Sequence, residues 1–173
     1  MAYILIHSAS DRPEMAMANS WCLARKAEKP VRIPRFELIY NQCSFHLMWK
    51  THNNDFLLVP ESVKQILYLL LLKHKTAYGI RIFAYCFMSN HIHIVGQLAD
   101  KIRFSRFLQL VHSRFAKAYN KVHGRRGQVI QDRAKTPVIE DDVYLKRAMI
   151  YTELNPWKAK MVKDPKNYRF SSY

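Results

Sequence analysis

The stretch YCFMSNHIHIVGQ, residues 85–97, contains the turn of an expected β-hairpin. Apolar residues fill the stretch on both sides of Ser89 and Asn90, two residue types that favour turns. The pattern therefore predicts two antiparallel strands, at residues 80–88 and 91–97. The rest of the fold is built outward from this hairpin.

Two histidines stand at the beginning of the second strand of the hairpin. His91 and His93 are separated by Ile92. Side chains alternate between the two faces of a strand, so both imidazoles should point one way and Ile92 the other. Neutral imidazole is a common metal ligand, and two on one face suggest a shared metal ion. A lone histidine would more often be a packed core residue, and the spacing alone is weak evidence.

On either side of the hairpin, the sequence alternates between strand-like and helical patterns. Aromatic and β-branched runs indicate strands, whereas apolar residues at helical spacing indicate helices. The expected elements are a strand at 42–51, helices at 60–75 and 103–121, short β-like pieces at 128–131 and 136–140, and a helix from residue 143.

The order β-α-β-β-α-β-β-α predicts the α+β class, with helices packed on one face of an antiparallel sheet. The last helix is expected to end near Asn155 and Pro156, because the residue before a proline avoids the helical region. Residues 1–33 show no steady periodicity and are expected to form an N-terminal extension or basic arm. Residues 34–173 are then one domain.

The chain is strongly basic, with 28 Lys and Arg against 13 Asp and Glu and a net charge of +15. Such an excess is usually retained for a polyanionic partner, with nucleic acid as the first candidate and an anionic membrane as the second. The longest apolar run, at 66–72, is far below the about 20 residues of a membrane span. Three widely spaced cysteines suit neither a disulfide framework nor a zinc site. A cytoplasmic protein without a membrane partner is expected.

The second helix combines an apolar stripe with a basic remainder, and a glycine-flanked basic turn follows it. Such a charge run can simply be solvated, but a basic turn near an active site favours contact with phosphate. The residues predicted from charge to bind DNA are Arg114, Lys117, Lys121, Arg125 and Arg126.

The last helix carries Tyr151 and Asn155, which are four residues apart and share one face. The histidine pair and an amide oxygen would give three neutral ligands for a divalent cation, beside a phenol that could attack a phosphodiester. With ten tyrosines in the chain, an ordinary packing role for Tyr151 stays open. Tyr144, on nearly the same face, is the rival nucleophile.

Several motifs in this order resemble the REP-associated tyrosine transposases, which are single-tyrosine HUH transposases of the IS200-like class. The most specific pair is His-Ile-His and, about 60 residues later, Tyr-x-x-x-Asn-Pro. QDRAK and DPKNYRFSSY add to the likeness, which covers the chain from about Arg35 to its end. Ser89 stands where this family usually has proline, and the change spares the candidate ligands.

The resemblance implies a ferredoxin-like core that cleaves and rejoins single-stranded DNA near hairpins, through a 5′-phosphotyrosine intermediate. It implies Mg²⁺ or Mn²⁺ as cofactor and single-stranded or hairpin DNA as partner, with a monomer favoured and a dimer possible. The alternative is a catalytically silent DNA-binding protein of the same fold. By residue, the resemblance assigns metal binding to His91, His93 and Asn155, the nucleophile to Tyr151, and DNA contacts to Gln131 and Arg133.

Overall fold

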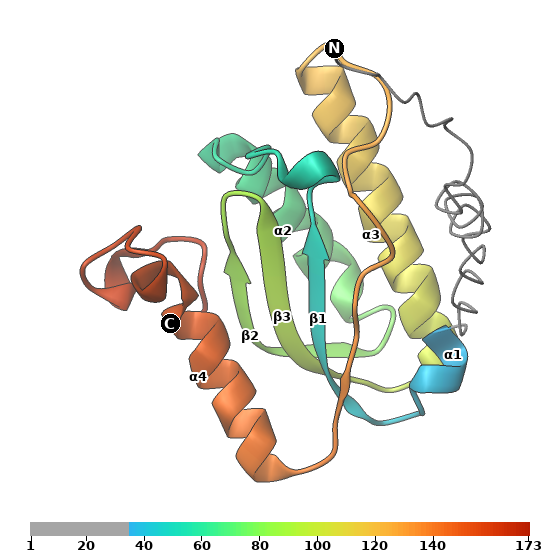
Figure 1. The fold of residues 1–173 in the computed structure, drawn as a ribbon. Coiled ribbons are helices and arrows are strands. Elements are labelled where there is room, and N and C mark those ends of the chain that lie inside the picture. The colour runs from blue at the N-terminus through green and yellow to red at the C-terminus, as the bar shows by residue number, and fades with distance from the viewer. Residues whose placement is uncertain (1–34) are drawn as a thin grey trace, which may run out of the picture. The chain divides into compact units, whose positions relative to one another are not determined.

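The computed structural model describes residues 35–173, which form a sheet with helices on both of its faces (Figure 1). The expected extension at 1–33 lies outside the described residues. In chain order the elements are α1 (Arg35–Leu38), β1 (Ser44–Lys50), α2 (Glu61–Lys75), β2 (Ile80–Phe87), β3 (His91–Leu98), α3 (Lys101–Val122), β4 (Val138–Ile139) and α4 (Asp142–Lys158), with 3-10 turns at His52–Asn54 and Pro165–Asn167.

The four strands form one antiparallel sheet in the order β2-β3-β1-β4. The expected hairpin of β2 and β3 is confirmed, and its turn lies at Ser89 and Asn90. β1 pairs with the other side of β3, in a register that sets Met48 opposite His93. The α+β class predicted from the sequence is therefore confirmed.

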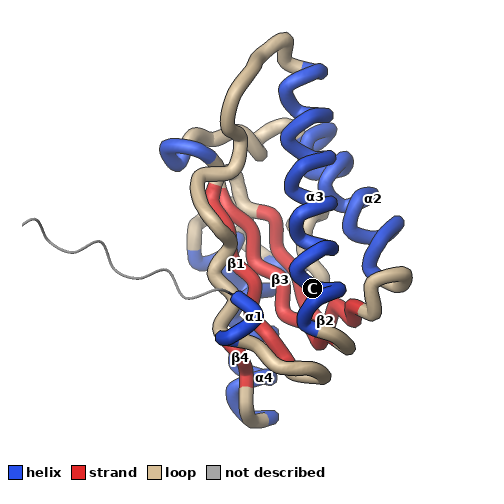
Figure 2. The backbone as a smooth tube through the Cα atoms, turned by 90° about the vertical axis from the view of Figure 1, so that its right-hand side faces the viewer, coloured by secondary structure: helices blue, strands red, loops and turns tan. Residues whose placement is uncertain are grey.

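The main core lies between one face of the sheet and helices α2 and α3, which lie together on that side (Figure 2). Ile92 and Ile94 of β3 are 1% and 2% exposed, because they point to this face. Burying such side chains contributes about 1.5–3 kcal/mol each. Other members of this core are Phe45, Leu47, Leu67, Phe104, Phe107, Val111 and Phe115.

Helix α4 packs on the other face of the sheet, over a small second cluster of buried residues. The cluster consists of Ala84 from β2, Val95 from β3, Ile139 from β4 and Ala148 from α4 itself. The two alanines have small side chains, which let the helix lie close to the strands. The expectation that all helices share one face of the sheet is therefore confirmed for α2 and α3 and wrong for α4, which packs on the other face.

The structure corrects two of the expected elements. The last helix does not end near Pro156 but runs through it to Lys158. A proline removes only one hydrogen bond of the helical ladder, and the next bonds still form, as Ala159 N donates to the Asn155 carbonyl at 2.9 Å. The β-like piece at 128–131 makes only an isolated bridge, between Ile130 and Thr51 of the neighbouring chain segment.

The structure also bears on two expectations from composition. Cys43 and Cys86 are buried free thiols, whereas Cys22 lies outside the described residues. Among residues 35–173, no helix combines the length and the apolar character that crossing a membrane requires.

Gly96 should be indispensable for the pairing of β2 and β3. A Cβ at this position would overlap the carbonyl oxygen of Arg81 and lie 3.2 Å from Cζ of Phe45. We expect Gly96→Ala to lower the free energy of unfolding by about 1–3 kcal/mol or more, as overpacking does. Chemical denaturation measures this. Gly124→Asn is the control, since Gly124 has open space around it and a positive φ that asparagine tolerates; equal losses in both variants would contradict the prediction.

Candidate active site

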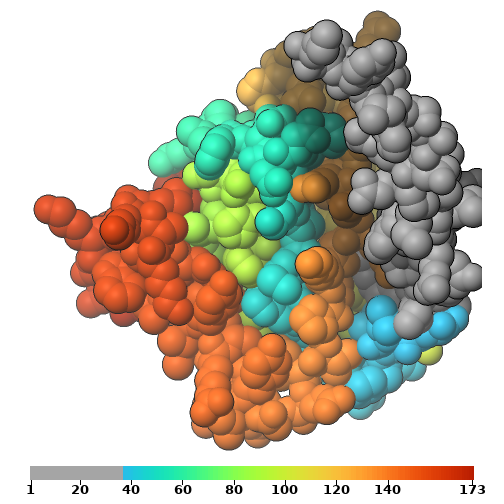
Figure 3. Space-filling view, viewed as in Figure 1, coloured from blue at the N-terminus to red at the C-terminus, as the bar shows by residue number. Residues whose placement is uncertain are grey.

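A cavity of about 600 Å³ opens on the α4 side of the sheet. Figure 3 views the molecule from this side and shows the strands as a floor between α4 and the segment that leads into β4. Most of the residues that line the cavity have polar or charged side chains. The lining residues are Met48, Trp49, Lys50, Asn54, Asn90, His91, His93, Gln131, Asp132, Arg133, Lys135 and Tyr151.

The structure brings the histidine pair and the candidate tyrosine to this one cavity. The ring centroids of His91 and His93 are 5.1 Å apart, as expected for alternate residues on one strand face. The ring of Tyr151 stands edge-on to His93 at 5.7 Å between centroids. Residues from β3 and α4, about 60 positions apart in the chain, thus meet at the same wall.

The ring of His91 is oriented by its neighbour Asn90. Asn90 Oδ1 lies 2.7 Å from Nδ1 of His91, and Nδ2 of the same amide donates to the Asn54 carbonyl at 3.2 Å. With Nδ2 so occupied, Oδ1 accepts the proton of His91 Nδ1. The other ring nitrogen of His91, Nε2, then carries a lone pair, which is the arrangement that metal-binding histidines adopt.

His46 of β1 is a member of this site that the sequence analysis did not single out. Its Nε2 lies 3.0 Å from Nδ1 of His93, and both side chains are only 5% exposed. The ring of His46 also stands edge-on to Tyr151, with centroids 6.3 Å apart. The available signal was its place on a strand expected to lie in the same sheet, but the register with β3 was not in the sequence.

The three histidines are held in their neutral form by burial. Burial lowers the pKa of His46. It also lowers the pKa of His91, with a smaller contribution from Lys50. For His93, burial and then the neighbouring His46 and His91 lower the pKa to about 3. A neutral imidazole keeps one lone pair, so the charge state of His91 and His93 at neutral pH is the one that a metal ligand requires.

Tyr151 projects from α4 with 43% of its surface exposed, so its phenol is open to a ligand in the cavity. The ammonium of Lys158 lies 4.8 Å from the centroid of its ring, a cation–π contact. This contact exists because α4 continues through Pro156. The rival nucleophile Tyr144 is not among the lining residues and stands in the first turn of the helix, where its backbone N–H is capped by Asp141.

The expected third metal ligand, Asn155, is not among the residues that line the cavity. Its side chain is mostly buried, and Nδ2 donates to the carbonyl of Tyr151 at 3.0 Å. Within residues 35–173, no group of three or more His, Cys, Asp or Glu side chains is placed to hold a metal ion. The structure thus supplies two imidazole nitrogens at the cavity, and any further ligand would come from amides or from solvent.

The rim of the cavity is cationic. Lys50, Arg133 and Lys135 line it, and within the described residues Asp132 supplies the one carboxylate among them. Gln131 also lines it, and the buried Oε1 of this side chain has no hydrogen-bond partner. Of the residues predicted to bind DNA, Gln131 and Arg133 are therefore at the candidate active site.

The other predicted DNA contacts lie elsewhere. Arg114, Lys117 and Lys121 belong to α3, which covers the opposite face of the sheet. Arg114 there contacts Nε2 of His74 at 3.2 Å. The turn after α3 carries Arg125 and Arg126, and the guanidinium of Arg125 lies over the ring of Tyr119. The structure does not bring these five side chains to the cavity of Tyr151.

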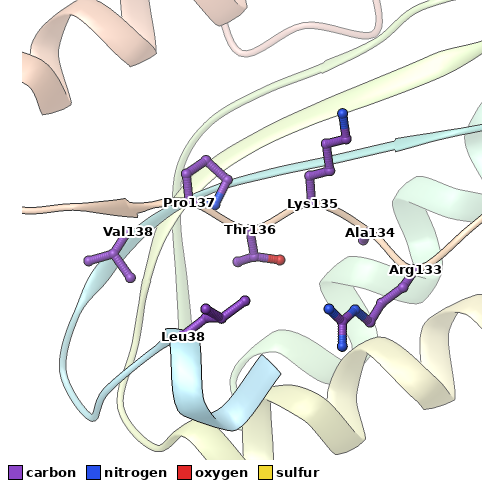
Figure 4. A pocket seen from close by; sticks show the side chains of 7 residues that line it. All are labelled: Leu38, Arg133, Ala134, Lys135, Thr136, Pro137 and Val138. Atoms are coloured by element: carbon purple, nitrogen blue, oxygen red, sulfur yellow. The ribbon is translucent and has the colours of Figure 1, made fainter. Parts of the chain in front are cut away.

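A smaller hollow of about 380 Å³ adjoins the main cavity. Arg133 and Lys135 border both spaces. Figure 4 shows Thr136 turned toward Leu38 on the side of the smaller hollow, whereas Lys135 points to the opposite side of the segment. The segment 131–138 thus carries cationic side chains, Arg133 and Lys135, on both of its sides.

A sequence family model and a solved structure give the family and the fold, respectively. Residues 39–133 match the family model described as IS200-like transposase. A solved structure of a REP-associated tyrosine transposase bound to a REP hairpin superimposes with a TM-score of 0.67, at 19% identity over 82% of each chain. A putative transposase from Deinococcus radiodurans R1 gives a TM-score of 0.47, at 18% identity over 69% of this chain and 92% of that one. No curated protein matches the sequence.

The buried His93 should make the fold sensitive to acid. An unfolded histidine takes up a proton near pH 6.5, whereas folded His93 stays neutral until about pH 3. The unfolded state therefore binds more protons between these values, and stability is lost as the pH falls through this window, by up to about 1.4 kcal/mol per pH unit. Urea denaturation of the wild type and of His93→Asn across this range measures the difference. Parallel pH profiles of the two proteins would contradict the assignment.

Proposed function

The chain belongs to the family of IS200-like transposases, and on that premise we propose that it is a metal-dependent endonuclease and strand transferase acting on single-stranded DNA near hairpins. The observation that carries the proposal is the meeting of Tyr151, His91 and His93 at one cavity with a cationic rim. A nucleophile, a pair of neutral imidazoles and phosphate-binding charges are the groups this reaction needs.

Tyr151 is the proposed nucleophile. Its phenolic oxygen attacks the phosphorus of a phosphodiester, and the proton of the phenol leaves to solvent, to which the exposed side chain has access. The bond from phosphorus to the 3′-oxygen breaks, and that oxygen takes up a proton. The products are a 5′-phosphotyrosine and a free 3′-hydroxyl, and attack of a 3′-hydroxyl on the phosphotyrosine would rejoin DNA. The Lys158 ammonium lies 4.8 Å from the centroid of this ring, so a positive charge accompanies the phenol at the cavity.

We propose that Mg²⁺ or Mn²⁺ is held by His91 and His93, with the amide of Asn155 as a third ligand. Two observations fit the imidazole part of this set: both rings are neutral, and Asn90 leaves Nε2 of His91 free to coordinate. Asn155 would need to turn its amide oxygen toward the cavity. The hydrogen bond that Nδ2 donates to the Tyr151 carbonyl does not use that oxygen. When bound, such an ion would draw charge from the phosphate under attack.

The cations of the rim are proposed to hold the DNA backbone. Lys50, Arg133 and Lys135 surround the cavity and suit phosphate groups on either side of the cut. A partner with a hairpin is supported by the solved structure of similar fold, which was determined bound to a REP hairpin.

The nucleophile can be identified covalently. Incubation with a labelled single strand that contains a hairpin, in the presence of Mn²⁺, should leave a nucleotide adduct on Tyr151, located by digestion and mass spectrometry. Tyr151→Phe should lose cleavage almost completely, because no other phenol among residues 35–173 lines the cavity. Chelation of the metal should have the same effect.

Tyr144→Phe is the matched control, since this tyrosine lies on the same helix outside the cavity, and it should cleave like the wild type. An adduct on Tyr144, or strong cleavage by Tyr151→Phe, would contradict the assignment. Tight DNA binding by the wild type with no cleavage of any strand would favour the catalytically silent alternative.

Charge reversals on the two faces of the sheet should separate the proposed DNA contacts. Binding of a short unpaired strand weakens with salt, by a log–log slope of about 0.7 for each phosphate neutralised. Reversing Arg133 and Lys135 together should reduce this slope by about 1.4, because both border the cavity. Reversing Arg114 and Lys117 should leave it unchanged, because α3 covers the other face. Fluorescence anisotropy at several salt concentrations measures both; a reduced slope for the α3 pair would place DNA on that helix.

A further inference from the structure

Each imidazole of the histidine pair has one ring nitrogen engaged by a neighbouring side chain. For His91 the neighbour is Asn90, whose amide is fixed by a second bond, so the direction of the hydrogen bond is settled. For His93 the neighbour is His46, with 3.0 Å between Nε2 of His46 and Nδ1 of His93. In this second hydrogen bond, either His46 Nε2 or His93 Nδ1 can carry the proton, because a neutral imidazole has one donor and one acceptor.

The two directions have opposite consequences for His93. If His46 donates, Nδ1 of His93 accepts, and the single proton of neutral His93 then sits on Nε2, which leaves no lone pair for a metal ion. If His93 donates from Nδ1, its Nε2 carries the lone pair instead. Only the second direction places the proton of His93 on Nδ1 and the lone pair on Nε2, as the hydrogen bond to Asn90 does for His91.

We propose that His46 is a positioning residue for His93: its Nε2 accepts the proton of His93 Nδ1, which fixes the tautomer and the ring orientation that a metal ligand needs. The inference rests on the proposed function, because it takes His93 to be a ligand. His46 would thus play for His93 the part that a carbonyl or carboxylate commonly plays behind a metal-bound histidine.

The fold holds His46 in the place this role requires. In the register of β1 and β3, His46 lies opposite Val95, two residues along the strand from His93 and on the same face. Its backbone N–H donates to the Pro137 carbonyl at 3.0 Å, which anchors β1 from its other side. The ring is 5% exposed and also meets the ring of Tyr151, so it has little room to turn away.

The same geometry argues against His46 as a ligand in its own right. Its Nε2 is the nitrogen at hydrogen-bond distance from His93, so this nitrogen is not available to an ion while the bond is made. In agreement with this, the described part of the chain contains no triad of His, Cys, Asp or Glu side chains arranged around a common ion.

Two substitutions of His46 test the role. His46→Leu replaces the acceptor by an apolar side chain of similar size, and His46→Gln keeps an acceptor, the amide oxygen, near the position of Nε2. Phe45→Leu is the control for general weakening of β1, since Phe45 is 1% exposed and belongs to the core on the opposite face. Circular dichroism and denaturation establish that each variant folds.

The first readout is the tautomer of His93 in the metal-free protein, from long-range ¹H–¹⁵N spectra assigned with His93→Gln. The wild type and His46→Gln should show the proton on Nδ1, and His46→Leu should lose this preference. The second readout is Mn²⁺ affinity, measured by electron paramagnetic resonance without DNA. His46→Leu should bind Mn²⁺ about 10- to 100-fold more weakly, as loss of such a supporting bond does, whereas His46→Gln and Phe45→Leu should stay near the wild type.

A wild-type His93 with its proton on Nε2, or a His46→Leu variant with unchanged tautomer and Mn²⁺ affinity, would overturn the inference. If the wild type binds no Mn²⁺ and cleaves no DNA, the proposed function fails in its metal part. The tautomer measurement still decides the direction of the His46–His93 bond in that case, so the two failures are distinguishable.

Discussion

The alternation of side chains along β3 is the constraint on which the rest of the structure depends. Ile92 and Ile94 point into the main core under α2 and α3, and His91 and His93 point to the cavity on the other face. A slip of one residue in the register would reverse both sets. Isoleucines would then lose about 1.5–3 kcal/mol each of burial, and imidazoles would enter an apolar core without partners. The same apolar packing that stabilises the sheet therefore fixes the direction of the histidines.

Helix α4 depends on contacts far from its own sequence. Its apolar cluster against the sheet is small, and other links add to it. The hydroxyl of Ser172 donates to Glu153 on α4 at 3.0 Å and accepts from the backbone N–H of Tyr85 on β2 at 2.9 Å. One side chain of the C-terminal segment thus ties the helix to the sheet. The position of Tyr151 over the histidines is a property of this assembly and not of the helix alone.

The charges of the side chains around the cavity differ between its floor and its rim. At its floor, burial keeps the imidazole of His93 uncharged, and it does the same for His46 behind that ring. At its rim, the long side chains of Lys50, Arg133 and Lys135 stay charged in contact with solvent. A polyanion can therefore be attracted by the rim, while the imidazoles at the floor carry no charge. Neutral ligands and cationic surroundings coexist because the dielectric environment differs between the two layers.

The sequence by itself determined the local elements. Apolar runs on both sides of the Ser89-Asn90 turn predicted the β2–β3 hairpin, and helical spacing predicted α2 and α3, because these patterns depend on residues close together in the chain. The shared face of His91 and His93 followed from the same alternation. Spacing was less informative for α4, since the local rule that ends helices at proline does not include tertiary burial, and both Asn155 and Pro156 are buried in the helix that continues to Lys158.

Only the tertiary structure decided which distant residues meet. Strand register set His46 behind His93, and the passage of α4 to the face opposite α3 brought Tyr151 to the histidines and left Arg114, Lys117 and Lys121 on the other side. A sequence pattern gives the face of an element on which a residue lies. It does not give the side of the sheet on which that element packs, because this depends on the burial of apolar surface summed over the whole chain.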